Sequence, residues 1–374
     1  MQAAGWFLLA LAILAWSRRS LPAWSALRRL ARLPALEAAA MDFAQPGRGR
    51  AANSPEQIPL RGWRDILWRT WREFNHDHIP QVAGGVAFFG LLAVFPAIGV
   101  FVSLYGLFSN VDIARAQLEL LAGVLPEAAL QLVGDQMMRL AAARHTGLGI
   151  AFVTSLAVSL WSANAGMKAL IVGLNIAFEE TEKRNLIRLN LISLGFTAGM
   201  IMFLLAAFSA VVAGPILLAH IGGEAMVIAV LRWPLLLAIA VAGLAVLYRF
   251  GPSRDREKWR WVSWGSAFAA LLWLSASLLF SFYVAHFGSY DRTYGSLGAA
   301  VGFLTWMWIS TITILLGAEL NSEIEHQTAV DTTTGRPEVM GLRNAHMADT
   351  LGKPAPEKLD FKSPNKGENP PARP

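Results

Sequence analysis

Six long apolar stretches constrain this chain more than any other feature of its sequence. They cover residues 83–105, 147–170, 187–213, 229–248, 263–286 and 297–318. A helix of about 20 apolar residues crosses the hydrocarbon core of a bilayer. The chain is 55% hydrophobic and only 16% charged, whereas a soluble domain has about 25% charged residues. The sequence therefore predicts an all-α integral membrane protein with six transmembrane helices.

The loops between these stretches predict the orientation of the helices. Lysines and arginines gather in "EETEKRNLIR" after the second stretch and in "YRFGPSRDREKWR" after the fourth. The loop "AGPILLAHIGGEAMV" after the third has none. Because basic residues remain in short cytoplasmic loops, we expect both ends of the six-helix unit to be cytoplasmic. The fourth stretch is the least regular, since Arg232 and Pro234 lie at its start.

The basic balance of the chain does not require a nucleic-acid partner. The net charge is +6 and the pI is about 9.8, but basic cytoplasmic loops account for both in a membrane protein. We therefore expect no nucleic-acid binding. The chain has no cysteine, which excludes disulfides, thiolate metal sites and a cysteine nucleophile.

Four regions outside the apolar stretches complete the expected organisation around a transmembrane domain at 81–326. Residues 1–59 are predicted to be a poorly ordered N-terminal extension or to follow from a mis-assigned start, with the chain beginning near Met41. Their short apolar segment 5–16 could alternatively form a seventh helix. Residues 112–142 are predicted to form two amphipathic helices on the periplasmic side. Residues 327–374, rich in Pro, Lys and Glu, are predicted to be a disordered cytoplasmic tail.

The fourth of these regions, residues 60–80, has the pattern of an amphipathic helix. Its apolar residues recur at steps of three and four, and its arginines lie largely off that stripe; the stripe is Leu60, Trp63, Leu67, Trp71 and Phe74. This spacing is typical of a helix lying in the inner membrane interface. A helix packed on the cytoplasmic side of the bundle would have the same pattern, and the sequence leaves both interpretations open.

The second apolar stretch carries a set of polar residues that share one helical face. Asn164, Lys168, Asn175 and Glu179 fall within about 60° of one another at 100° per residue. This face could line a path for a solute, an ion or a lipid headgroup. It could also belong to a long helix that emerges into the cytoplasm, with Lys168 extending to the headgroups.

The sixth stretch ends in "LLGAELNSEIE", which places Glu319 directly after an apolar run and Asn321 just beyond it. A carboxylate at that depth needs a partner or a proton. Lys168, at a similar depth, is the candidate partner that we expect. An acid at the water interface is the alternative.

Searches for catalytic motifs give no candidate residues. The sequence has no G-x-x-x-x-G-K-[ST] loop and no H-E-x-x-H motif. His76, Asp77 and His78 could hold a metal, but a polar helix boundary is the favoured interpretation. The acids Glu179, Glu180 and Glu182 lie in a short basic loop without complementary residues. We therefore expect no catalytic residue, no cofactor, no metal and no enzymatic activity.

Four segments resemble the YihY/BrkB family of bacterial inner-membrane proteins: "GGVAFFGLLAVFPAIGV", "ALIVGLNIAFEETEKRN", "YVAHFGSYDRTYGSLG" and "WMWISTITILLGAELNSEIE". The resemblance covers about residues 60–326. It implies a six-helix protein of the inner membrane. The motif positions that it implies are Phe95, Pro96, Asn175, Arg184, Tyr294, Gly295, Ser296, Gly298, Gly317, Glu319 and Asn321.

The resemblance implies less about activity. Members of the family have carried ribonuclease and virulence labels, and links to envelope lipid biology and ion exchange have been suggested. The ribonuclease label conflicts with the missing carboxylate site. We expect a transport-type protein that moves a lipid, an ion or a small solute in envelope homeostasis. A non-transporting scaffold for envelope machinery is the alternative. The expected partners are the bilayer, a lipid or ion substrate, and further copies of the chain or envelope proteins.

Overall fold

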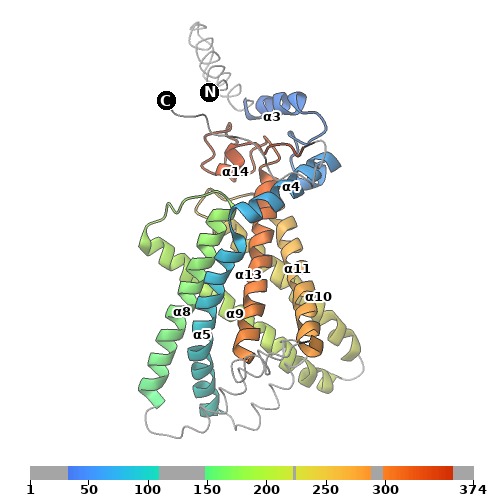
Figure 1. Cartoon of the computed structure of the whole chain (residues 1–374). Coiled ribbons are helices and arrows are strands. Elements are labelled where there is room, and N and C mark those ends of the chain that lie inside the picture. The colour runs from blue at the N-terminus through green and yellow to red at the C-terminus, as the bar shows by residue number, and fades with distance from the viewer. Residues whose placement is uncertain (1–32, 109–147, 222–224, 288–297, 357–374) are drawn as a thin grey trace.

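A computed structural model of the chain describes residues 33–108, 148–221, 225–287 and 298–356 (Figure 1). These residues form helices joined by loops, with one isolated β-bridge between Glu257 and Thr333. The helices are α3 (Leu33–Ala44), η1 (Pro55–Gln57), α4 (Leu60–His76), α5 (Ile79–Phe108), α8 (Leu148–Ala177), α9 (Leu186–Ile221), α10 (Ala225–Phe250), α11 (Trp259–Phe287), α13 (Gly298–Glu325) and α14 (His346–Asp349). The all-α expectation is confirmed for the described residues.

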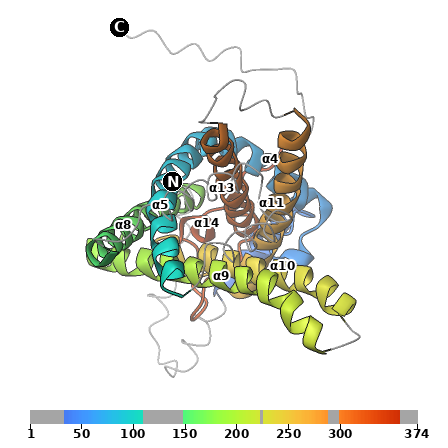
Figure 2. The same cartoon turned by 90° about the horizontal axis from the view of Figure 1, so that it is seen from below.

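Six long helices form a closed ring in the order α5, α8, α9, α10, α11 and α13, with α13 returning to α5 (Figure 2). Each predicted apolar stretch lies mainly within one of them. The main apolar core fills the half of the ring nearest α4, and Ile171, Leu174 and Leu315 are fully buried within it. The ring closes because α13, the last of the six helices in sequence, packs against α5, the first.

Four helices in the described part of the chain are long and apolar enough to cross a membrane: Leu156–Ala177, Leu186–Phe203, Trp259–His286 and Ala300–Glu325. A fifth span is obtained if α4 and Ile79–Val94 of α5 count as one, although they meet at 61°. The apolar helix described within α10, Pro234–Phe250, is shorter. Its start coincides with the irregularity that Arg232 and Pro234 introduce into the fourth apolar stretch.

The amphipathic helix α4 packs on the bundle through buried charged residues and apolar side chains together. Asp65, Arg69 and Ile66 are fully buried, whereas Leu60 is 88% exposed and Trp71 67% exposed. Of the two sequence interpretations, packing on the bundle is observed, and part of the predicted apolar stripe stays exposed. The leucine and tryptophan side chains are left free for an apolar environment.

Residues 33–59 and 326–356 form an end cap beside α4, above the helix ring in Figure 1. Arg50 donates to the carbonyls of Gln327 (3.0 Å) and Gly352 (2.6 Å), and Arg343 donates to Ala329 (2.9 Å) and Ala348 (2.7 Å). Burial, aided by the positive charge of Arg69, lowers the pKa of Arg50 to about 10. The end cap is thus held together by buried arginines that saturate backbone carbonyls.

The end cap corrects two predictions of disorder. Residues 33–59 were expected to be poorly ordered or to follow from a mis-assigned start, and residues 327–356 to belong to a disordered tail. In the structure both ranges pack into the end cap, where buried hydrogen bonds to arginine, and not apolar burial alone, hold the segments in place. Residues 5–16, 112–142 and 357–374, for which separate predictions were made, lie outside the described residues.

Candidate functional site

Glu319 is the least satisfied charged residue in the described part of the membrane helices. It lies on α13, it is 0% exposed, and neither of its carboxyl oxygens has a hydrogen-bond partner. Its carboxyl group lies within hydrogen-bonding reach of Asp77, in the turn between α4 and α5, with Glu73 also nearby. Two carboxylates cannot donate to each other when both are ionised, so this pair needs a proton or a cation.

Glu323, one turn further along α13, has the basic partner that Glu319 lacks. Its carboxylate pairs with the Nε of Arg69, and Arg69 also donates to the Glu323 carbonyl (3.1 Å). The same guanidinium donates to Gln327 Oε1 (2.8 Å) and to the carbonyl of Lys353 (3.0 Å). Arg69 is thereby committed to α13 and the end cap.

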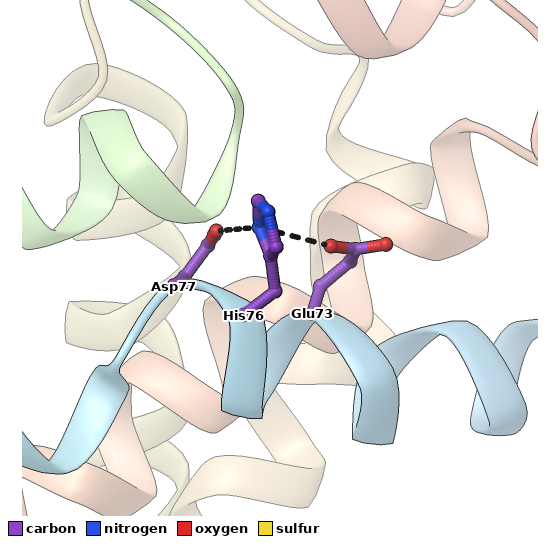
Figure 3. Close-up of side chains that lie close together, drawn as sticks. All are labelled: Glu73, His76 and Asp77. Atoms are coloured by element: carbon purple, nitrogen blue, oxygen red, sulfur yellow. Dashed lines mark hydrogen bonds and ion pairs between the residues drawn. The ribbon is translucent and has the colours of Figure 1, made fainter. Parts of the chain in front are cut away.

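Figure 3 shows three side chains that lie together where α4 ends: Glu73, His76 and Asp77. His76 Nδ1 is 3.1 Å from Asp77 Oδ1 and 3.6 Å from Glu73 Oε2. Arg72 pairs with the other oxygen of Glu73, Oε1. One ligand atom from each of Glu73, His76 and Asp77 lies within 4.8 Å of the other two. The fold therefore gathers a carboxylate–imidazole cluster in which Asp77 lies beside Glu319.

The turn that creates this cluster follows from local chain geometry. Glu73 and His76 are three residues apart, which places them on the same side of the last turn of α4. His78 then adopts a left-handed backbone conformation, with φ of 50°, and α5 starts at Ile79 in a new direction. The sequence analysis grouped His76 and Asp77 with His78; in the described residues Glu73 completes the group instead.

The predicted ion pair between Lys168 and Glu319 is not formed among the described residues. Lys168 lies half-buried on α8, and the charged groups that act on Glu319 are the acids Asp77, Glu323 and Glu73. The prediction was wrong because a similar depth on two helices does not make their side chains face each other. Asn164, also on α8, is buried and its Oδ1 has no hydrogen-bond partner.

Asn175 connects two loops. Its Oδ1 accepts the backbone N–H of Ser253 (2.8 Å) and its Nδ2 donates to Glu182 (3.1 Å). Arg184 pairs with Glu182 (2.7 Å) and donates to the carbonyl of Gly251 (2.8 Å). Although partial burial opposes it, hydrogen bonding to Arg184 and Asn175 lowers the pKa of Glu182 to about 2.

Glu179 lies beyond the end of α8, so it does not share a helical face with Asn175. The helix ends at Ala177, and Glu179 adopts a left-handed conformation with φ of 51° that terminates it. Its carboxylate lies 2.9 Å from Nε2 of His346 in the end cap. The polar face predicted for the second stretch therefore shrinks to Asn164, Lys168 and Asn175.

Asn321 joins α13 to α11. Its Oδ1 accepts the N–H of Gly265 (2.8 Å) and its Nδ2 donates to the carbonyl of Val262 (3.1 Å). A Cβ added to Gly317 would lie 2.5 Å from the Cβ of Ala269, and one added to Gly265 would overlap Asn321. The two glycines thus allow the close approach of α11 and α13.

A second buried acid lies where α10 meets α11. Arg254 contacts both Glu257 (3.2 Å) and Glu325, and both carboxyl oxygens of Glu257 are buried without hydrogen bonds. Burial and the neighbouring Glu325 raise the pKa of Glu257 to about 8, although Arg254 acts in the opposite direction.

The remaining motif positions are placed only in part. Gly298 starts α13 and is buried. Phe95 and Pro96 lie in α5, but their side chains are outside the described part of the structure. Tyr294, Gly295 and Ser296 lie in the range 288–297, which is also outside it.

Sequence reasoning found Glu319 and Asn321 but missed Arg69 and Glu73, and it did not connect His76 and Asp77 to Glu319. The arginines, Arg69 among them, were predicted only to lie off the apolar stripe of helix 60–80, and Glu73 was not singled out. The Glu73-x-x-His76 spacing was a readable sign that the two side chains share a helical face. The contact of α4 with α13, more than 200 residues away in sequence, was not readable.

The helical fold and the apolar spans define the chain as a membrane protein. The family model of the virulence factor BrkB matches residues 70–340, and the chain belongs to this family. It is 30% identical to the putative ribonuclease-like protein YfkH of Bacillus subtilis over 63% of this chain and 86% of that protein. A UPF0761 membrane protein of Tolumonas auensis is 26% identical, over 71% and 87% respectively. Another, from Pseudoalteromonas translucida, is 26% identical over 74% and 89%. No solved structure matches the chain.

Proposed function

We propose that this protein crosses the bacterial inner membrane with six helices and that its α4 end faces the cytoplasm. The two basic loops support this orientation, because both lie at the α4 end and touch each other through Arg184 and Gly251. Both loops also contact the end cap: Lys183 donates to Asn344 (3.2 Å) and Lys258 donates to the carbonyl of Asp331 (2.6 Å). The exposed leucine and tryptophan side chains of α4 would then lie in the inner interface.

The function that the site supports best is transport of an ion, a lipid or a small solute across this membrane. The observation that carries the proposal is Glu319, a fully buried carboxyl group in a spanning helix without a hydrogen-bond partner. Ionisable residues inside membrane helices are costly and are typical of ion paths and proton relays. Asp77 links Glu319 to the α4 end, and the exposed imidazole of His76 continues the polar row to the surface.

Reconstitution into liposomes tests this proposal with two readouts. An internal pH-sensitive dye reports proton or cation movement, and a fluorescent lipid that becomes accessible to an external reductant reports lipid movement. We expect the wild-type protein to accelerate one of the two, and Glu319→Gln to abolish the acceleration. Glu338→Gln, which changes an exposed acid of the end cap, is the matched control and should behave like wild type.

The alternative, a scaffold for envelope machinery, predicts a different outcome. A scaffold would complement a deletion strain equally well with Glu319→Gln as with the wild-type gene. We further propose that the chain has no ribonuclease activity of its own. Purified protein incubated with RNA and divalent metal should leave the RNA intact, and cleavage that is lost in a point variant would overturn this part of the proposal.

A further inference from the structure

The cluster at the end of α4 holds more negative charge than its arginines neutralise. Arg72 pairs with Glu73 and Arg69 pairs with Glu323. The carboxyl groups of Asp77 and Glu319 remain side by side, and the remaining basic partner is the imidazole of His76 on Asp77. Two adjacent carboxylates without a matching guanidinium leave an excess of negative charge that a divalent cation would balance.

The geometry of the cluster fits a metal ion of the first transition row. Such ions bind imidazole nitrogen and carboxylate oxygen at about 2.0–2.2 Å, so two ligand atoms around one ion lie about 3–3.6 Å apart. His76 Nδ1 is 3.1 Å from Asp77 Oδ1 and 3.6 Å from Glu73 Oε2. Because Arg72 contacts Glu73 through Oε1, Oε2 is available on the side that faces His76 (Figure 3).

Glu319 provides the independent sign that the cluster binds something. It is 0% exposed, its two carboxyl oxygens have no hydrogen-bond donor among the described residues, and it lies beside Asp77 of the cluster. A buried acid without a donor is rare in folded proteins. The exposed edge of His76, with 78% of its side chain accessible, gives an ion a route from the aqueous side.

We propose that Glu73, His76 and Asp77, with Glu319 beneath them, form a binding site for a divalent transition-metal ion such as Mn²⁺, Fe²⁺ or Zn²⁺. Mixed imidazole and carboxylate ligands favour these ions over Mg²⁺ and Ca²⁺, which prefer oxygen ligands alone. The Glu-x-x-His spacing supplies two ligands from one face of a helix, as in carboxylate metal sites of helical bundles. This inference goes beyond transport, because the site can bind a metal whether or not the protein moves a substrate.

Mn²⁺ is a suitable probe because free Mn²⁺ in solution has an electron paramagnetic resonance signal that is lost on binding. Purified full-length protein is stripped with a chelator and titrated with Mn²⁺. We expect wild type to bind one ion per chain, and His76→Ala, Asp77→Asn and Glu319→Gln to weaken binding by at least about tenfold, as loss of a ligand or of its support does.

His78→Asn is the matched control, because it changes the neighbouring histidine outside the cluster and asparagine tolerates the left-handed conformation. It should bind Mn²⁺ as wild type does. No binding to wild type would overturn the proposal, as would equal binding by wild type and His76→Ala. His76 is exposed, so its substitution should leave folding intact, which thermal unfolding of the same sample verifies. Binding of Mn²⁺ by a protein that is inactive in liposomes would refute the transport function and leave this site standing.

Discussion

Glu319 and Glu323 lie one turn apart on α13, and both are buried, yet their surroundings are opposite. Glu323 is held by Arg69, whose guanidinium also ties down Gln327 and the carbonyl of Lys353. Glu319 faces Asp77 and has no donor. Burial of a carboxylate therefore has two different consequences here. The carboxylate of Glu323 completes a structural network, whereas that of Glu319 still requires a proton or a cation.

The largest loss of stability is expected from replacing Arg69. Arg69→Ala leaves the buried carboxylate of Glu323 without its partner, and removing one member of a buried ion pair costs about 3–5 kcal/mol. We expect a large fall in the melting temperature of the detergent-purified protein and release of the end cap to proteolysis. Glu338→Gln, an exposed acid in the end cap, serves as control. A melting temperature equal to that of wild type would show that the buried carboxylate of Glu323 does not depend on Arg69.

Glu319→Gln should shift stability in the opposite direction. The amide keeps the shape of the carboxyl group and can donate to Asp77, and a hydrogen bond to a charged acceptor contributes about 1.5–3 kcal/mol. We expect a higher melting temperature than that of wild type when both are measured with a chelator present. A destabilised Glu319→Gln variant would indicate that Glu319 has a structural partner, as Glu323 does.

The close contact of α11 and α13 lies on the face of α13 that carries Gly317 and Asn321. At 100° per residue the two acids lie on about the opposite face, so widening this contact should cost packing energy without removing their partners. Gly265→Ala places a methyl group against Asn321 and the carbonyl of Gly317, and overpacking of this kind costs about 1–3 kcal/mol. The control is Gly199→Ala on α9, where an added Cβ meets no atom within 4 Å. Thermal unfolding should separate the two variants, and equal melting temperatures would show that α11 and α13 can move apart without cost.

Glu257 is a third kind of buried acid. It has Arg254 nearby, but neither of its oxygens has a hydrogen bond among the described residues. Its pKa is raised from 4.5 to about 8, so the folded protein keeps a proton that the unfolded chain has already lost. Stability therefore falls as pH rises through this range. Arg254, Arg249 and Glu325 are the charged groups that face Glu257.

Glu257→Gln should remove this part of the pH dependence. Melting temperatures measured across the range should fall less steeply with rising pH in the variant than in wild type. An unchanged slope would show that Glu257 is ionised throughout, with Arg254 as a full partner.

The site was predictable in its residues but not in its contacts. Glu319 and Asn321 stand out because they interrupt or follow an apolar run, which is a local property of the sequence. Their partners come from α4 and α11, and nothing local to α13 indicates which of them meets Glu319. The expected partner Lys168 lies on α8, and the acids of α4 are nearer to Glu319.

The helical class and the helix that contains each apolar stretch were predictable from the sequence alone, because hydrophobic periodicity is summed over neighbouring residues. The membrane-protein family was predictable from four short segments of the sequence. The tertiary structure adds that α4 buries Asp65 and Arg69, that residues 33–59 and 326–356 form an end cap, and that Asp77 lies against Glu319. Each of these depends on buried polar contacts between segments far apart in sequence. Such contacts are set by which elements become neighbours, and composition does not encode that choice.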